Sequence, residues 1–117
     1  MQVYIKNSDQ AVEFYQDVFD AEVMVYGKNE DGTIVHAEQN IFGQIFAFCE
    51  IPEPEAVTGN TMQFCLDFGE GNEDIVQRIY DKLKEGAKSY TPLGPCDWTP
   101  LFTDITDKYG VRWCIFL

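Results

Sequence analysis

An internal repeat is the feature that most constrains the fold of this chain. Each half carries the same order of predicted elements: a short strand, an amphipathic helix and three further strands. Equivalent apolar residues of the two predicted helices are separated by the same number of residues: Val12 corresponds to Val76, and Phe19 corresponds to Leu83. Because one such half cannot bury the apolar face of its own sheet, the halves are expected to form a single domain. The sequence therefore predicts an α+β fold built from two βαβββ modules.

A stretch poor in apolar residues separates the two modules. Residues 52–60 contain two prolines and a glycine, a composition that is typical of a linker. The modules are therefore expected at about residues 1–51 and 61–117 of one domain that spans residues 1–117.

Two segments have the periodicity of amphipathic helices, Ser8–Phe19 and Asn72–Glu85. Ser8 and Asn72 are the expected N-caps, because their side-chain oxygens can accept a hydrogen bond from the first turn. Gly86 is expected to end the second helix. The predicted strands alternate in polarity or are rich in β-branched and aromatic residues. They are Gln2–Ile5, Glu22–Tyr26, Thr33–Gln39, Gln44–Ile51, Met62–Phe68, Ala87–Thr91, Leu101–Thr106 and Val111–Leu117.

Composition excludes several classes of partner and of site. The net charge of −12 repels phosphate backbones and anionic lipid, so neither nucleic acid nor a membrane is an expected partner. No stretch approaches the roughly 20 apolar residues that span a bilayer. The first residues also lack the pattern of a signal peptide, so a cytoplasmic location with reduced cysteines is expected. The four cysteines form no Cys-x-x-Cys pair, which argues against a zinc ribbon or a redox motif.

A series of short matches, in order along nearly the whole chain, resembles the vicinal oxygen chelate superfamily, which includes glyoxalase I, bleomycin-resistance proteins and extradiol dioxygenases. Within it the chain looks like the PhnB-like branch. The matching stretches are Ala11–Phe19, Val35–Glu38, Gly59–Asp67, Ile79–Gly86, Thr91–Leu93 and Thr106–Trp113. The resemblance implies that each half curls its strands into an open sheet, with the helices on the convex side and a cavity on the concave side. It also implies a homodimer.

The same resemblance implies where a catalytic metal would be held. Active members bind a divalent ion with four side chains, two from the first strands of the halves and two from the last strands, usually His, Gln and Glu. The matching positions here are Gln2, Gln63, Ala47 and Cys114, and a shifted register would replace Gln2 by Tyr4. This set contains no carboxylate and no imidazole, and neutral amides are weak ligands. We therefore expect no metal and no cofactor.

Without a metal, the expected role of the cavity is to bind a small molecule. The candidate ligand-binding residues are His36, Gln63, Cys65, Trp98, Arg112, Cys114 and Phe116.

Strand alternation and loop position select these candidates. On the last strand, Arg112 shares a face with Cys114 and Phe116; it either clamps an anion or pairs with a carboxylate of the surface. Trp98 stands in a proline-flanked loop, as a lid over the cavity or as a dimer contact. His36, the single histidine, shares a strand face with Glu38, and such a pair can do acid–base work if a substrate lies beside it.

Three functions remain open at this stage. The residues favour a metal-free protein that binds a small molecule, comparable in kind to the bleomycin-resistance proteins, over an enzyme. The first alternative is a metal-dependent lyase, isomerase or dioxygenase of the superfamily. The second is a dimeric interaction module without a ligand. Methyl transfer has no support, because no glycine-rich loop follows a strand and opens a helix.

Overall fold

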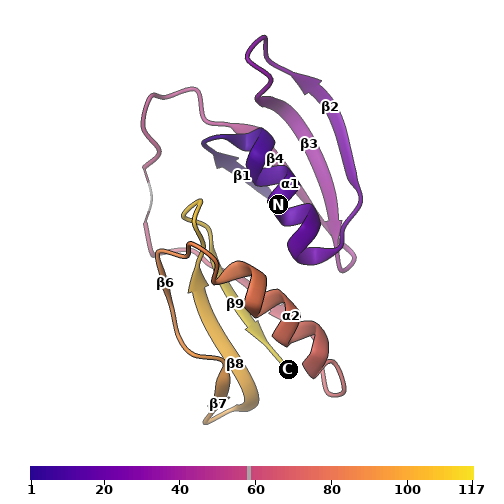
Figure 1. Ribbon diagram of the computed structural model, residues 1–117, viewed down its shortest axis with the longest axis vertical. Coiled ribbons are helices and arrows are strands. Elements are labelled where there is room, and N and C mark those ends of the chain that lie inside the picture. The colour runs from indigo at the N-terminus through magenta and orange to yellow at the C-terminus, as the bar shows by residue number, and fades with distance from the viewer. Residues whose placement is uncertain (58) are drawn as a thin grey trace. The chain divides into compact units, whose positions relative to one another are not determined.

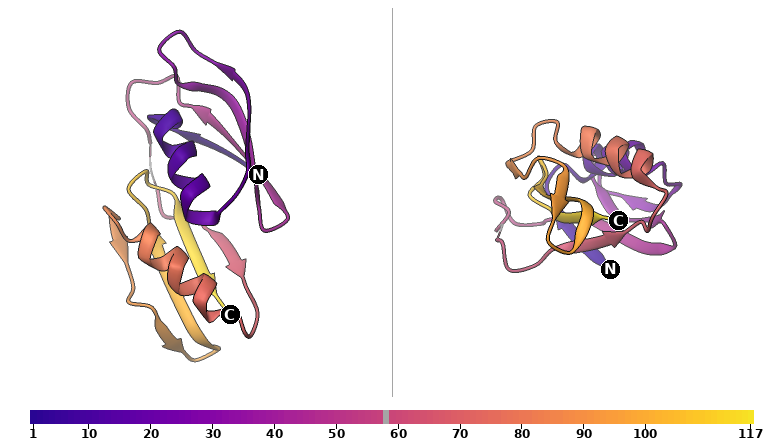
Figure 2. Two further views of the ribbon diagram at one scale, coloured as in Figure 1. Left: turned by 45° about the vertical axis from the view of Figure 1, so that its right-hand side comes forward. Right: turned by 90° about the horizontal axis from the view of Figure 1, so that it is seen from below.

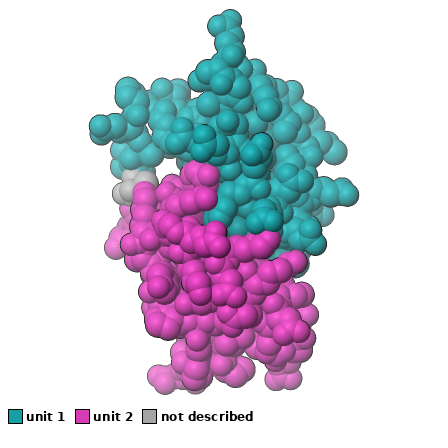
Figure 3. All heavy atoms as spheres, in the orientation of Figure 1, with its two compact units in different colours: residues 1–57 teal, residues 58–117 magenta. Residues whose placement is uncertain are grey.

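The computed structural model describes residues 1–57 and 59–117, which form two compact units, Met1–Val57 and Thr58–Leu117. Figure 3 colours unit 1 teal and unit 2 magenta. The two predicted modules fall one in each unit. The predicted linker includes Thr58, which lies outside the described residues.

Unit 1 has the predicted order of strand, helix and three strands (Figure 1). Its strands form a sheet in the order β1-β4-β3-β2, in which β1 runs parallel to β4 and the other neighbours are antiparallel. The elements are β1 (Gln2–Ile5), α1 (Ser8–Phe19), β2 (Val23–Lys28), β3 (Ile34–Ile41) and β4 (Gln44–Glu50).

Unit 2 repeats this plan with one additional strand. Its sheet has the order β5-β9-β8-β6, again with a parallel pair, β5 and β9, and the short strand β7 also pairs with β8. The elements are β5 (Phe64–Asp67), α2 (Glu73–Leu83), β6 (Ser89–Tyr90), β7 (Gly94–Cys96), β8 (Thr99–Thr106) and β9 (Arg112–Phe116).

Strand β7 corrects the sequence prediction, which placed residues 94–100 in a loop. Gly94 and Pro95 are residues that disfavour a central strand, but β7 pairs only with β8, and proline is tolerated where a strand has one free edge. The prediction was wrong because the glycine and proline of this segment indicate a loop, whereas its strand is defined by pairing with β8, which composition does not reveal.

In each unit the helix covers one face of its sheet, and the apolar core lies between them (Figure 2). The other face carries no helix of its own unit, and we call it the open face. Side chains alternate across the strands, so neighbouring positions are sorted between core and open face. The fully buried core side chains include Tyr15, Phe46 and Phe48 in unit 1, and Ile79, Ile105 and Trp113 in unit 2. In the described part of the chain, neither helix is long and apolar enough to cross a bilayer.

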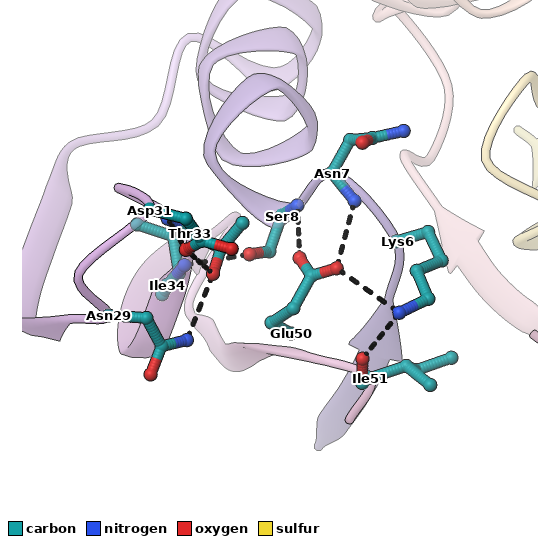
Figure 4. A network of polar contacts seen from close by, with 9 residues as sticks. All are labelled: Lys6, Asn7, Ser8, Asn29, Asp31, Thr33, Ile34, Glu50 and Ile51. Atoms are coloured by element: carbon teal, nitrogen blue, oxygen red, sulfur yellow. Dashed lines mark hydrogen bonds and ion pairs between the residues drawn. The ribbon is translucent and has the colours of Figure 1, made fainter. Parts of the chain in front are cut away.

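The start of α1 is capped by a residue that is distant in sequence. Both carboxylate oxygens of Glu50, at the end of β4, accept backbone N–H groups at the helix start, from Asn7 at 3.2 Å and from Ser8 at 2.7 Å (Figure 4). The negative charge also lies at the positive end of the helix dipole. The predicted cap was wrong, since the Ser8 hydroxyl instead accepts the N–H of Ile34 at 2.8 Å and ties the helix to β3.

Asn72 is the N-cap residue of α2, as predicted, but its side chain makes none of the expected capping hydrogen bonds. Its Nδ2 donates to the carbonyl of Phe68 at 2.7 Å and closes the loop between β5 and α2. An asparagine side chain can hydrogen-bond to the backbone of a neighbouring loop, and it is then not available to cap the helix.

Candidate functional site

The open face of unit 2 brings together most of the predicted ligand-binding residues. In the parallel pair β5–β9, Cys65 lies directly opposite Cys114, and in the antiparallel pair β8–β9, Phe102 lies opposite Phe116. Asp104 of β8 lies opposite Cys114 on its other side. The candidate site on this face therefore has an apolar end at Phe102 and Phe116 and a polar end at Asp104.

The two thiols of this face have different environments. Cys114 is buried, whereas Cys65 is exposed. Burial, and secondarily the neighbouring Cys65, raises the pKa of the Cys114 thiol to about 12. Cys114 is therefore a neutral thiol at physiological pH and provides an apolar wall; it is neither a ready nucleophile nor a ready metal ligand.

The polar end is an ion pair with two hydrogen bonds. The Nε and Nη2 of Arg112 donate to the two carboxylate oxygens of Asp104 at 3.0 and 2.6 Å, and Nη1 donates to the carbonyl of Asn60 at 2.9 Å. The amide of Gln63 donates to the same carboxylate at 3.3 Å. The Arg112 bonds lower the pKa of Asp104. Of the two roles predicted for Arg112, the structure shows the pairing with a carboxylate.

An open pocket of about 340 Å³ adjoins this ion pair. Hydroxyl groups make up much of its wall, so the pocket offers several hydrogen-bond donors and acceptors to a ligand. Its lining residues are Asn60, Ser89, Tyr90, Thr91, Asp104, Thr106 and Arg112.

The apolar end is an aromatic cluster with an exposed tryptophan. Trp98 lies in the turn between β7 and β8 and is 61% exposed. Its ring contacts Phe116 and Phe102 edge-on, at centroid distances of 4.9 and 5.5 Å. These contacts hold the indole beside the open face while leaving most of it accessible.

His36, the remaining candidate, lies on the open face of unit 1. Its Nε2 is 3.1 Å from Oε1 of Glu38, so the pair that the strand alternation suggested is formed. Its Nδ1 is 3.8 Å from the sulfur of Cys49 on β4. Cys49 is not among the site residues that the sequence predicted.

The hairpin between β3 and β4 contains a sequence signal that could have predicted the contact between His36 and Cys49. Phe42 and Gly43 form its two-residue loop, and both have positive φ, at 49° and 89°, as in a type I′ turn. A two-residue loop fixes the register of the strands on both sides, and counting back from it places Cys49 opposite His36.

Solved structures establish the fold. The chain is similar to a PhnB protein from Bacillus cereus, with 23% identity, coverage of 100% of this chain and 95% of that one, and a TM-score of 0.81. A glyoxylase/bleomycin resistance protein/dioxygenase domain from Frankia sp. shares 14% identity over 100% of this chain and 93% of that one, with a TM-score of 0.77. The chain has the glyoxalase fold.

Another protein with this glyoxalase fold is the fosfomycin resistance protein FosX from Listeria monocytogenes, at 14% identity, coverage of 99% and 88%, and a TM-score of 0.70. One structure of FosX holds manganese(II) and a dihydroxypropylphosphonic acid. No family model matches the sequence, and no curated protein matches it. At these identities the likeness concerns the fold alone.

Strand register bears on one of the four positions that the resemblance implies for a metal. Gln2 lies opposite Ala47 in unit 1, and the equivalent pair in unit 2 is Cys65 and Cys114. By this pairing, the residue of unit 2 that is equivalent to Gln2 is Cys65, which lies two residues after Gln63.

The corrected set does not fit a catalytic divalent ion. The Ala47 side chain offers no donor, the Gln2 amide is a weak ligand, and the Cys114 thiol would have to lose a proton that burial holds. Among residues 1–57 and 59–117, no three His, Cys, Asp or Glu side chains are grouped so that they could hold a metal ion.

Proposed function

We propose that this glyoxalase-fold protein binds a small organic molecule without a metal, on the open face of unit 2. The exposed ring of Trp98 on Phe102 and Phe116 is the observation that carries the proposal. An indole that is fixed by packing and still faces water can cover a flat ligand at a small cost in conformational entropy.

The chemistry of the face indicates a ligand with two different sides. Cys114, Cys65 and the aromatic cluster offer an apolar surface, whereas the adjoining pocket is lined by hydroxyl groups. Its volume of about 340 Å³ lies within the range of about 300–1,000 Å³ that ligand pockets occupy. Because Asp104 balances the charge of Arg112, we propose a neutral aromatic molecule with a hydrogen-bonding edge.

Tryptophan fluorescence tests this proposal. Trp113 is fully buried and Trp98 is exposed, so a ligand on the open face is expected to change the emission of Trp98. A library of neutral aromatic fragments should yield at least one saturable titration. For that fragment, Trp98→Phe should weaken binding measured by calorimetry by about 10-fold, while Gln77→Ala on the exposed side of α2 should leave it unchanged.

Two results would contradict the proposal. The first is that no fragment produces a saturable change, which would favour an interaction module without a ligand. The second is one tightly bound divalent ion per chain in protein purified without chelator, which would favour the metal-dependent enzyme.

We also propose that the protein forms a homodimer, as the resemblance implies. Strand β2 is an edge of the unit 1 sheet, and its side chains at Met24, Val25 and Tyr26 are 60%, 44% and 59% exposed. An apolar edge strand of this kind favours pairing with another chain.

Light scattering at micromolar concentration should give twice the chain mass for the native protein and the monomer mass for Val25→Lys. The control Val57→Lys, at a fully exposed position, should remain dimeric, and a monomeric native protein would refute the proposal.

A further inference from the structure

Four polar side chains from three strands meet on the open face of unit 1. Cys49 of β4 lies 3.8 Å from Nδ1 of His36 on β3, and the Nε2 of His36 lies 3.1 Å from Glu38. The amide of Gln2 on β1 donates to the Cys49 sulfur at 3.2 Å. A thiol, an imidazole and a carboxylate thus stand in line, with an amide donor at the sulfur.

The carboxylate determines how the imidazole is protonated. An ionised Glu38 only accepts hydrogen bonds, so the Nε2 of His36 carries the hydrogen of the short contact between them. The lone pair of a neutral ring is then on Nδ1, which faces the thiol of Cys49. His36 is therefore oriented to accept the thiol proton, and Glu38 is placed to stabilise the imidazolium that results.

A β-bulge positions Glu38 itself. Two residues of β2, Tyr26 and Gly27, face the single residue His36 of β3, and the Tyr26 ring lies 5.5 Å from the His36 ring. The Tyr26 hydroxyl donates to Oε2 of Glu38 at 3.3 Å. Partial loss of hydration, followed by the charge of Glu38, raises the pKa of Tyr26, so the phenol remains a neutral donor. Bulges often direct a side chain in this way beside a reactive site.

Cys49 is only 7% exposed, but it lines a pocket that can admit a substrate. An open pocket of about 450 Å³ is lined by Cys49, His36, Gln2 and Tyr4 among others. The Gln2 amide also donates to the Tyr4 hydroxyl at 3.0 Å, which keeps its nitrogen beside the sulfur. An N–H donor at this place can stabilise negative charge on an oxygen bound to a carbon under attack.

We propose that Cys49 is a nucleophile that accepts acyl groups from neutral activated esters and thioesters. The thiol proton passes to Nδ1 of His36, and the sulfur attacks the carbonyl carbon. A C–S bond forms, and the bond to the leaving group breaks as that group departs with the electron pair and takes the proton from His36. Water, deprotonated by His36, then attacks the thioester carbon, and the released Cys49 thiolate regains its proton from the imidazolium.

The experiment uses p-nitrophenyl acetate as the probe and the full-length protein. We expect a burst of p-nitrophenolate close to one equivalent per chain, with the acetyl group located on the Cys49 peptide by mass spectrometry. Cys49→Ala should abolish the burst. His36→Gln should slow it by about 100-fold, the range of a general base, and Glu38→Gln should slow it to a smaller extent. Glu30→Gln, which removes the same charge from the turn before β3, should leave the rate unchanged.

The chain contains its own reference thiol. Cys65 is exposed and has no imidazole neighbour in unit 2, because His36 is the single histidine of the sequence. Acetylation of Cys65 at the same rate as Cys49, or an unchanged burst in folded His36→Gln, would overturn the proposal. Circular dichroism of each variant identifies a loss of folding. The ratio of the acetylation rates of Cys49 and Cys65, measured in one sample of the native protein, is decisive and needs no substitution.

Discussion

Replacing Phe48 by alanine is expected to lower the free energy of unfolding by about 3–5 kcal/mol. The ring is fully buried between the sheet of unit 1 and α1. It stacks on Tyr15 at a centroid distance of 5.1 Å and on Phe46 at 6.4 Å. Alanine removes the apolar area and leaves a cavity that rigid aromatic neighbours cannot fill. Since small domains are stable by only about 5–15 kcal/mol, the variant should be close to unfolding at 37 °C.

Urea denaturation followed by far-ultraviolet circular dichroism measures this loss. Ile45→Ala on the same strand is the control, because Ile45 is 43% exposed and its truncation should cost less than about 1 kcal/mol. Equal losses in the two variants would show that the packing between β4 and α1 is not the source of stability that the structure indicates.

Replacing Asp107 by alanine is expected to cost about 3 kcal/mol, the second largest effect. Its carboxylate is fully buried in the connection between β8 and β9. One oxygen accepts the backbone N–H groups of Tyr109 and Val111 at 2.9 and 3.0 Å, and the other accepts the indole N–H of the buried Trp113 at 2.9 Å. Alanine would leave these three donors without this partner in the interior, and a buried unsatisfied donor costs about 1–3 kcal/mol.

Both tryptophans lie in unit 2, so denaturation followed by their fluorescence reports this effect. The control is Asp97→Ala in the exposed turn between β7 and β8, which should stay within about 0.5 kcal/mol of the native protein. A nitrogen-15 NMR spectrum adds a direct readout, because the indole N–H signal of Trp113 should shift in Asp107→Ala. An unchanged signal together with unchanged stability would contradict the assigned role of the carboxylate.

Prediction from sequence succeeded where local pattern and local chemistry agree. The apolar stripe of α1 predicted the helix Ser8–Phe19, and the structure has these bounds. Gly86 has φ of 70°, a conformation that suits glycine after the end of a helix. The repeat predicted an α+β fold built from two βαβββ modules, and the solved structures of the same fold confirm that class.

Prediction failed where a partner lies far away in sequence. The cap of α1 comes from Glu50, which stands 42 residues after the Ser8 N–H that it accepts. The residue of unit 2 that is equivalent to Gln2 is Cys65 and not Gln63, because only the pairing of β5 with β9 fixes that register. Such pairings depend on the burial of whole strand faces, which no short window of sequence contains.

The amino-acid sequence alone determined the α+β class and the two-module plan, because periodicity and turn residues are written in the chain itself. The tertiary structure decided which side chains meet. It paired Arg112 with Asp104, set Trp98 against Phe116, and brought Cys49 to His36. The physical reason is that strand pairing brings together residues from distant segments, and its register is chosen by the burial of the whole sheet.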